Sequence, residues 1–373
     1  MSTTIHTDFP GGCLGAVESA APGALTVRLY REHAADGVHT QATWFYARLS
    51  GLEGQPLALT LSGLGDVWNG RPSFSINERD LPVVSDDGRA WRRLAESRFD
   101  RAAGTVTFDL EPAGDVLWLA MLEPYGPAEL AVLSRAVLAH PEGRGEVAGL
   151  TVGGRPLALW SIGDEAAPHC VWVLARQHAW EAHTSWCAEG LVRWLLSDQA
   201  AEFRRRCVVK ILPLMDPDGV VRGGTRYNAH GYDVNRHWDA TDPADPEHRR
   251  LRPEICAALA ATDAWCAAGR PIDLHLNLHD TQTDVMILAA GMAAAGPVVG
   301  LHARLVAAGF TGPLQADGLA AGAAEDGVRR RYRVSAALIE LGTAQQPGCD
   351  HPPTAAERVA FGADLGRGLA AVI

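Results

Sequence analysis

The sequence predicts an α/β protein in which an antiparallel β-sandwich precedes a mixed β-sheet with flanking helices. From Asp8 to about Glu123, short runs of alternating apolar residues are separated by Gly-rich breaks, which is typical of an antiparallel β-sandwich. After the turn-forming segment Glu123–Pro127, helical and strand patterns alternate, which indicates a largely buried mixed sheet. We therefore predict two domains, residues 1–124 and residues 125–373.

The first domain shows strand patterns but no constellation of catalytic side chains. Its aromatic residues recur at strand spacing, which favours a place in the core over a platform for a ligand. The strands that we expect there are Leu25–Tyr30, Thr43–Leu49, Leu57–Leu61, Thr105–Phe108 and Val116–Ala120.

The second domain alternates between the two periodicities. The helices that we expect are Glu129–His140, Ala188–Ser197 and a final helix that starts at the capping box formed by Thr354 and Glu357. The strands that we expect are Pro156–Ile162, His169–Arg176, Cys207–Leu214, Ile272–His279, Val285–Ala290 and Ser335–Leu341.

Composition and charge exclude several classes of protein. The 373 residues contain no run of eighteen apolar residues, so we expect no membrane span. The N-terminus lacks the basic start and the apolar core of a signal peptide, and we therefore expect a cytoplasmic protein. Seven cysteines without a CxxC pair indicate reduced thiols. A net charge of −11 argues against a general nucleic-acid binder, because no positive field would attract phosphates.

A candidate metal site begins where the apolar run Val171–Leu174 meets the polar segment Ala175–Glu181. In that segment His178 and Glu181 are three residues apart, so an imidazole nitrogen and a carboxylate oxygen can point at the same place. The pair alone is a weak signal, because His-x-x-Glu occurs by chance in many chains, and a solvated turn is the simpler alternative.

A third ligand is expected at the end of the strand Asp273–His279. Ligands of open α/β sheets collect outside the carboxyl ends of the strands, which favours His279 over His275. Zinc held by two histidines and one glutamate keeps a fourth position open for water, as in catalytic sites. A structural zinc centre would be closed by a fourth protein ligand, usually cysteine, and we expect none to close this site.

Glu340 is a lone carboxylate in the apolar strand Leu338–Gly342. Because an unpaired carboxylate is costly to bury, a metal, a water molecule or a cation should face it. Such a residue suits a general base, and a salt-bridged position at a sheet edge is the alternative.

A Gly-rich segment with several arginines, residues 215–228, precedes Asn235 and Arg236. Arginines in such loops can grip carboxylates with two hydrogen bonds or stabilise a developing oxyanion. A solvated basic loop is the alternative.

Together these segments resemble the zinc carboxypeptidases, and in particular the cytosolic carboxypeptidase (deglutamylase-like) branch. The resemblance rests on five segments in matching order: Arg176-Gln177-His178-Ala179-Trp180-Glu181, Thr184-Ser185-Trp186, Asp216-Pro217-Asp218-Gly219-Val220, Arg226, and Asp233-Val234-Asn235-Arg236-His237-Trp238. It covers the second domain from about Val152 to Glu340, and more loosely the sandwich, which that branch also carries. Ala179 and Trp180 stand where the branch has Pro-Gly, and Asp216 stands where it has Asn.

The resemblance implies a carboxypeptidase-like sheet and a Zn²⁺ ion held by His178, Glu181 and His279. It also implies that Arg226 polarises the scissile carbonyl group and that Glu340 is the general base acting on water. The tyrosine that digestive carboxypeptidases bring over the substrate has no clear counterpart here.

The activity that the resemblance implies is that of a zinc metallocarboxypeptidase, which hydrolyses the C-terminal peptide bond of peptides or proteins. Asn235 and Arg236 would hold the terminal carboxylate of the substrate. Two alternatives stay open. A zinc amidohydrolase of N-acyl amino acids, similar to aspartoacylase or succinylglutamate desuccinylase, would share His-x-x-Glu and Asn-Arg but lacks the sandwich. A non-catalytic binding module on the same fold is the other, and the presence of Glu340 speaks against it. The sequence predicts no oligomeric state.

Four arginines lie at positions 329, 330, 331 and 333, just before the strand of Glu340. A solvated basic loop is one interpretation. The other is that one of them lines the pocket for the last side chain of the substrate, because the segment leads directly into Glu340. In the cytosolic carboxypeptidases a basic residue in the corresponding stretch is associated with glutamate removal. We therefore predict a preference for a C-terminal acidic residue.

Overall fold

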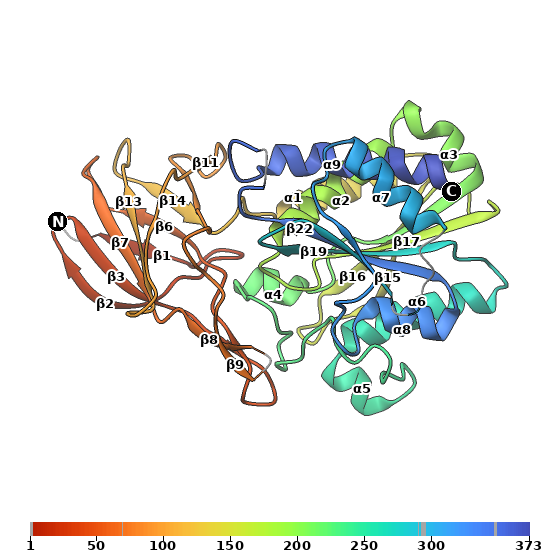
Figure 1. The fold of residues 1–373 in the computed structure, drawn as a ribbon, viewed down its shortest axis with the longest axis horizontal. Coiled ribbons are helices and arrows are strands. Elements are labelled where there is room, and N and C mark those ends of the chain that lie inside the picture. The colour runs from red at the N-terminus through yellow and green to blue at the C-terminus, as the bar shows by residue number, and fades with distance from the viewer. Residues whose placement is uncertain (1–2, 69, 290, 292–295, 347–348) are drawn as a thin grey trace.

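The structure is a computed structural model that describes residues 3–68, 70–289, 291, 296–346 and 349–373. The N-terminal sheets form one end of an elongated molecule, and a mixed sheet with helices forms the other end (Figure 1). This arrangement confirms the predicted fold class. The predicted boundary at residues 124 and 125 falls between the last N-terminal strand and the first helix.

The N-terminal part contains two five-stranded sheets and two hairpins. One sheet has the order β1 (Thr4–His6), β6 (Tyr46–Ser50), β14 (Leu117–Ala120), β10 (Val83–Ser85) and β11 (Arg92–Arg93). The other has the order β12 (Arg98–Asp100), β13 (Thr105–Leu110), β7 (Leu57–Ser62), β3 (Ala24–Leu29) and β2 (Gly15–Ala21). The hairpins are β4 (Glu32–His33) with β5 (Thr40–Gln41), and β8 (Gly65–Trp68) with β9 (Arg71–Phe74).

Alternation along the strands builds the core of this part. Leu59 and Leu61 of β7 and Phe108 of β13 are fully buried, and the rings of Phe45 and Phe108 lie 6.3 Å apart. One pairing differs from the antiparallel prediction, because β3 and β7 are parallel. The chain crosses to the other sheet through β6 before it returns to β7, and such a crossover permits parallel pairing.

The second part is built on an eight-stranded mixed sheet. Its order is β15 (Gly143–Leu150), β16 (Pro156–Ile162), β18 (Cys207–Leu212), β17 (His169–Ala175), β19 (Leu274–Thr281), β22 (Ser335–Gly342), β20 (Val285–Leu288) and β21 (Leu314–Gln315). The four central strands from β18 to β22 are parallel. The predicted strand 285–290 is found as β20, and Ala290 lies outside the described residues.

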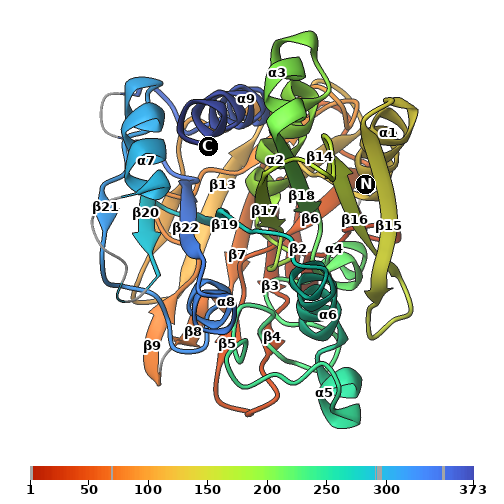
Figure 2. The same cartoon turned by 90° about the vertical axis from the view of Figure 1, so that its right-hand side faces the viewer.

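Helices cover both faces of this sheet (Figure 2). One face carries α1 (Pro127–Ala139), α2 (Ala182–Leu195), the short 3-10 helix Asp198–Ala200, α3 (Ala201–Arg206), α7 (Pro297–Ala307) and α9 (Ala355–Val372). The other face carries α5 (Pro246–Leu251), α6 (Pro253–Ala267) and α8 (Ala324–Tyr332), while α4 (Pro217–Arg222) lies toward the N-terminal sheets. None of the helices in the described residues is long and apolar enough to cross a membrane.

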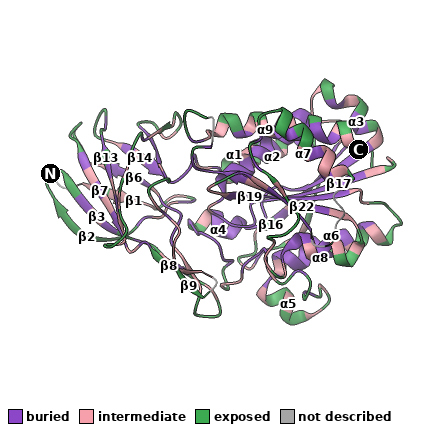
Figure 3. Ribbon diagram, in the orientation of Figure 1, coloured by how far each residue is buried: buried purple, intermediate pink, exposed green. Residues whose placement is uncertain are grey.

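The central strands are therefore buried on both sides (Figure 3). Val171 and Val173 of β17 pack under α2 and α9, whereas Trp172 and Leu174 belong to the cluster under α6. This explains the continuous apolar run in the sequence, which is typical of parallel strands with two covered faces. The functional side chains can only emerge where these strands end.

Helix α2 begins six residues earlier than the apolar pattern predicts, immediately after Glu181. Polar and β-branched residues in its first turn lower the helix propensity there. Asp280 compensates, because its Oδ2 accepts a hydrogen bond from the backbone amide of His183 at 2.9 Å. The capping box of α9 is found as predicted, with Glu357 N donating to Thr354 Oγ1.

Asp216 caps the short helix α4 from a fully buried position. Its Oδ1 accepts a hydrogen bond from Gly219 N at 2.8 Å, and its Oδ2 has no partner among the described residues. Burial raises the pKa of Asp216 to about 8, although the hydrogen bond from Gly219 opposes the shift. The folded protein therefore holds this carboxyl group in its neutral form.

We predict that Asp216→Asn changes how stability depends on pH. Because the pKa of Asp216 is higher in the folded than in the unfolded chain, its contribution to stability is complete below pH ~4 and is lost as the pH rises through about 8. Asparagine caps equally well and does not titrate. From pH 6 to pH 8 the wild type should lose about 1–2 kcal/mol of unfolding free energy relative to the variant. Urea unfolding in the presence of a chelator tests this, and an equal difference at both pH values would contradict it.

Candidate metal centre and active site

Three parallel strands bring the predicted site residues to one edge of the sheet. Ala175 of β17 pairs with Leu278 of β19, and His279 pairs with Glu340 of β22. The carboxyl ends of β17, β19 and β22 are therefore adjacent, which is where α/β sheets bind ligands. The segment after β17 carries His178 and Glu181 to the same edge.

A buried arginine shapes that segment. Arg176 adopts a left-handed backbone conformation, with φ of 56°. Its Nε donates to Ala179 O at 2.8 Å, and its Nη1 donates to Ser185 Oγ at 3.1 Å. The guanidinium group therefore links the backbone of the turn to the first turns of α2. With this turn, His178 and Glu181 face the same point although they lie outside any regular element.

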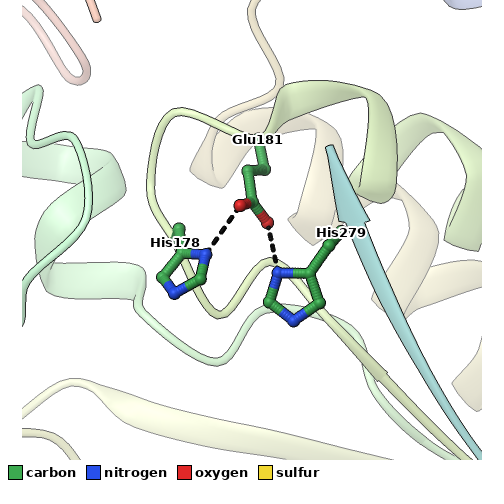
Figure 4. Close-up of side chains that lie close together, drawn as sticks. All are labelled: His178, Glu181 and His279. Carbon is green, nitrogen blue, oxygen red and sulfur yellow. Dashed lines mark hydrogen bonds and ion pairs between the residues drawn. The ribbon is translucent and has the colours of Figure 1, made fainter. Parts of the chain in front are cut away.

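His178, Glu181 and His279 form a buried cluster (Figure 4). The two oxygens of the Glu181 carboxylate point at different histidines: Oε1 lies 2.6 Å from His178 Nδ1, and Oε2 lies 3.0 Å from His279 Nδ1. One potential ligand atom from each residue lies within 4.8 Å of the others. Two imidazoles and one carboxylate in this arrangement form the donor set of a catalytic zinc site.

Each imidazole of the cluster has an acceptor on its far side. His178 Nε2 lies 3.0 Å from Asp233 Oδ1, and His279 Nε2 lies 3.0 Å from Gln177 Oε1. Such outer contacts hold the ring protons on Nε2 and direct Nδ1 inward, as in metal-binding histidines. A cation bound beside Glu181 would take the place of the Nδ1 protons, so the residues fit a metal ion.

The charges of the cluster favour ionised groups despite their burial. Burial alone would raise the pKa of Glu181, but the two neighbouring histidines outweigh it and lower that pKa to about 2. Burial would likewise lower the pKa of His279, yet attraction to Glu181 raises it to about 9. The carboxylate is therefore available as a ligand at any ordinary pH.

Glu340 faces the same cavity from β22. Its side chain is partly exposed to the cavity, while its Oε2 is shielded and has no hydrogen-bond partner among the described residues. The loss of solvation raises the pKa of Glu340 to about 7, and the positive charge of His279 opposes the shift. A carboxylate with this pKa can accept and release a proton near neutral pH.

Asp233 connects the metal cluster to the arginine loop. Its Oδ2 accepts a hydrogen bond from Arg226 Nε at 2.8 Å, while its Oδ1 faces His178. Burial would raise the pKa of Asp233, but Arg226 and His178 hold it well below the ordinary value. The guanidinium group of Arg226 is thereby fixed at the wall of the cavity.

The two residues expected to hold a terminal carboxylate, Asn235 and Arg236, also line the cavity. Asn235 Oδ1 accepts a hydrogen bond from Ala324 N at 2.8 Å, and its Nδ2 lies 3.2 Å from His279 Nε2. Arg236 Nη1 donates to the carbonyl oxygen of Asn235 at 2.7 Å. The seven predicted site residues thus meet in one place: His178, Glu181, Arg226, Asn235, Arg236, His279 and Glu340 all line a cavity of about 350 Å³.

The arginine run does not reach this cavity, in contrast to the hypothesis that one of its residues lines the pocket. Helix α8 buries Glu325 and Val328 and turns the arginines outward. Arg329 donates to Gly291 O at 2.8 Å, and Arg331 pairs with Asp263 at 2.6 Å. The nearby wall of the cavity is instead apolar and consists of Ile287, Leu319, Ala320, Ala323 and Leu338, next to Gly318.

A buried chain of hydrogen-bonded polar side chains lies behind His279, and the sequence patterns did not predict it. Asn277 Nδ2 donates to Gln177 Oε1 at 2.6 Å and to Glu325 Oε1 at 2.7 Å. The available signal was the alternation along β19, which places Asn277 on the same face as His279. Glu325 is fully buried, and nothing in the sequence distinguished it from a surface acid.

The chain is similar in sequence to known proteins over both parts. Residues 131–294 match the family model of zinc carboxypeptidases, and residues 5–122 match that of the cytosolic carboxypeptidase N-terminal domain. The chain is 27% identical over 297 residues to an uncharacterised protein of Zymomonas mobilis, which covers 78% of this chain and 71% of that protein. It is 30% identical over 232 residues to cytosolic carboxypeptidase 2 of Danio rerio, which covers 54% of this chain but only 31% of that much longer protein.

The fold is similar to solved structures over almost its whole length. A metallo-carboxypeptidase from Burkholderia cenocepacia has a TM-score of 0.83 at 24% identity, covering 99% of this chain and 98% of that one. A metallo-carboxypeptidase from Pseudomonas aeruginosa, solved in complex with (2-guanidinoethylmercapto)succinic acid, has a TM-score of 0.78 at 22% identity. Both parts of the chain therefore occur together in proteins of this fold.

We predict that the purified protein holds about one zinc ion per chain, as in other sites with two histidines and one carboxylate. His178→Ala and His279→Ala should each abolish stoichiometric zinc, because each removes one of only three ligands. Elemental analysis after dialysis measures the metal content.

His275→Ala is the matched control. His275 is buried on the same face of β19 but lies outside the cluster, and burial lowers its pKa to about 3. This variant should retain zinc. A normal zinc content in His279→Ala together with a depleted one in His275→Ala would overturn the assignment.

Proposed function

We propose a reaction for this chain on the premise that it belongs to the zinc carboxypeptidase family and is a peptide-bond hydrolase. The reaction is the zinc-dependent removal of the C-terminal residue from a peptide or protein. The observation that carries the proposal is the convergence of His178, Glu181 and His279 with Glu340 and Arg226 around one cavity. The names of the cytosolic relatives and the match of residues 5–122 favour this reaction over an N-acyl amino acid amidohydrolase, and they are also our reason to propose a cytoplasmic place of action.

His178, Glu181 and His279 would hold the metal. A zinc ion with three protein ligands supplies Lewis acidity: it lowers the pKa of water towards neutrality and polarises a carbonyl group. The protein contributes the orientation of the ligands, through Asp233 and Gln177, before any metal arrives.

Glu340 is the proposed general base. Its carboxylate lines the cavity beside the cluster, and its shielded Oε2 has no other partner among the described residues. With a pKa of about 7, it can take the proton of the attacking water and then deliver that proton to the amine of the departing residue.

The two arginines divide the recognition of the substrate between them. Arg226, held by Asp233, presents its guanidinium group to the oxygen of the scissile carbonyl as negative charge develops there. Arg236 and Asn235 hold the terminal carboxylate, which places the last peptide bond of the substrate at the cluster. These roles support an exopeptidase reaction, in which only the last bond is cleaved.

The apolar wall suggests which residue is removed. The apolar residues Ile287, Leu319 and Leu338 line the same cavity as Asn235 and Arg236, the proposed carboxylate site. The sequence led us to expect an acidic preference because of the arginines at positions 329–333. None of these arginines lines the cavity. We therefore propose that the enzyme prefers an apolar C-terminal side chain, since the arginines that line the cavity among the described residues, Arg226 and Arg236, are assigned to other groups of the substrate.

We predict that Glu340→Gln retains fold and zinc but loses turnover. The amide keeps the shape of the side chain and cannot accept a proton, so kcat should fall on the order of a hundredfold or more. Glu189→Gln is the control, because Glu189 is a buried carboxylate that pairs with Arg193 on α2 and lies outside the cavity. Undiminished turnover in Glu340→Gln would rule out the role of general base.

We predict that peptides differing only in the last residue are cleaved in the order Leu before Glu and Lys. The apolar wall favours the leucine side chain by burial, by about 1–3 kcal/mol, or roughly tenfold or more in kcat/KM. Mass spectrometry of the released residue measures the rates.

The same panel includes the peptide with a C-terminal amide. It should resist cleavage, because it offers no carboxylate to Arg236. Faster release of Glu than of Leu would restore the acidic preference, and equal cleavage of the amide would refute the exopeptidase reaction.

A further inference from the structure

Glu32, on the β4–β5 hairpin of the N-terminal part, reaches into the loop that carries Arg226. Its side chain is 5% exposed. Its Oε1 accepts a hydrogen bond from Arg222 Nη2 at 2.9 Å, and its Oε2 accepts hydrogen bonds from the backbone amides of Arg226 at 2.6 Å and Tyr227 at 3.1 Å. One carboxylate oxygen is therefore held by the loop itself, and the other by Arg222 at the end of α4, immediately before the loop.

The loop depends on such contacts because it has almost no secondary structure of its own. Residues 223–232 lie between α4 and the segment of Asp233, and the only regular pairing in this stretch is a single bridge from Tyr227 to Asp233. Buried backbone amides need acceptors, and the two amides held by Glu32 find them on a side chain of the sandwich. Charge-assisted bonds of this kind are short and directional, so they determine where the backbone of Arg226 lies.

Further contacts hold the same loop from the same side. Ala35 N donates to Gly231 O at 2.8 Å, and Gly11 N donates at 3.0 Å to the carbonyl oxygen of Val221 in α4, just before the loop. Thr225 O in turn accepts a hydrogen bond from Trp180 N at 3.0 Å, within the segment that carries His178 and Glu181. The sandwich, the arginine loop and the metal segment are thus linked through consecutive hydrogen bonds.

The β8–β9 hairpin adds an aromatic cover. The guanidinium carbon of Arg226 lies 4.4 Å from the ring centre of Trp68, and that of Arg236 lies 5.8 Å from it. Trp68 also lines the cavity that contains Glu340. A ring face stabilises a cation and screens it from water, and here it faces both arginines at once. Figure 1 shows this hairpin extending from the sandwich toward the second part.

We propose that the N-terminal sandwich completes the active site: Glu32 is a positioning residue for Arg226, and Trp68 holds the guanidinium groups of Arg226 and Arg236 in place. This inference rests on the proposed function, in which Arg226 acts on the scissile carbonyl. It gives the sandwich a role within the site and not that of a separate module for partner binding. The sandwich then acts on kcat through Arg226, and on KM through Arg236.

Glu32→Gln tests the first half. The amide group would direct an N–H toward one of three donors, so at least one bond to the loop is lost while the size is kept. We expect kcat to fall about tenfold with little change in KM and unchanged zinc content. Glu18→Gln is the control, since Glu18 is an acid of the same sandwich whose partners, Arg28 and Ser62, also belong to the sandwich, and it should behave as wild type.

A double-mutant cycle separates positioning from general damage. If Glu32 acts through Arg226, Glu32→Gln should lower the residual activity of Arg226→Ala by much less than tenfold. The same tenfold loss in both backgrounds would overturn the proposal. For Trp68, Trp68→Ala should raise KM several-fold and Trp68→Phe should restore most of it, because phenylalanine keeps the ring face. Equal KM values for Trp68→Ala and the wild type would refute the second half.

Hydrogen exchange gives a readout that does not depend on activity. In Glu32→Gln the amides of residues 223–232 should exchange faster than in the wild type and in Glu18→Gln, with β17 and β19 unchanged. Unchanged exchange in that loop would overturn the role of Glu32. If the wild type cleaves no peptide at all, the proposed function fails, and the exchange experiment still decides whether Glu32 holds the loop.

Discussion

The site depends on the register of three parallel strands. Because Ala175 lies opposite Leu278 and His279 lies opposite Glu340, the residues that follow or end β17, β19 and β22 meet at one edge. A shift of one residue in β19 would turn His279 to the other face of the sheet and leave Leu278 beside Glu181. The helices on both faces prevent such a shift, since it would also exchange the buried side chains on each side. The chemistry at the edge is thus secured by apolar packing in the middle of the sheet.

A second constraint is the burial of many charges within a small volume. Asp233 illustrates how it is met, because its two oxygens accept hydrogen bonds from Arg226 Nε and the amide of Asn235 and also face His178. Removing one partner of such a group leaves an uncompensated buried charge. The resulting loss of stability is larger than the stability that the intact pair contributes. Arg226 and His178 are therefore both positioned by Asp233, which is in turn positioned by the backbone amide of Asn235. That mutual support gives Arg226 a fixed position at the wall of the cavity.

Residue patterns predicted the fold class, and together with the resemblance to the zinc carboxypeptidases they named seven of the side chains that line the cavity. These motifs fall at the end of an apolar strand or in a Gly-rich loop, where sheet order brings them together. Patterns were less informative where the direction of a side chain decides the outcome. The arginine run before Glu340 turned outward, since α8 uses its other face for packing, and Glu325 of the same helix lies buried beside Asn277. The parallel pairing of β3 with β7 was also missed, because alternation along a strand does not reveal the direction of its neighbour. Long-range contacts such as that of Trp68 with Arg226 leave no local trace in the sequence.

The interface between the two parts explains why a sheet domain without catalytic motifs accompanies this site. Arg226 lies on a loop at the wall of the cavity, and its backbone amide has no backbone partner from a helix or a strand. The acceptor for the backbone amides of Arg226 and Tyr227 is not a group of the large sheet. Glu32 supplies it from the opposite side, and the ring of Trp68 covers the charge that results. Contacts from the sandwich thus determine where the backbone and the guanidinium group of Arg226 lie.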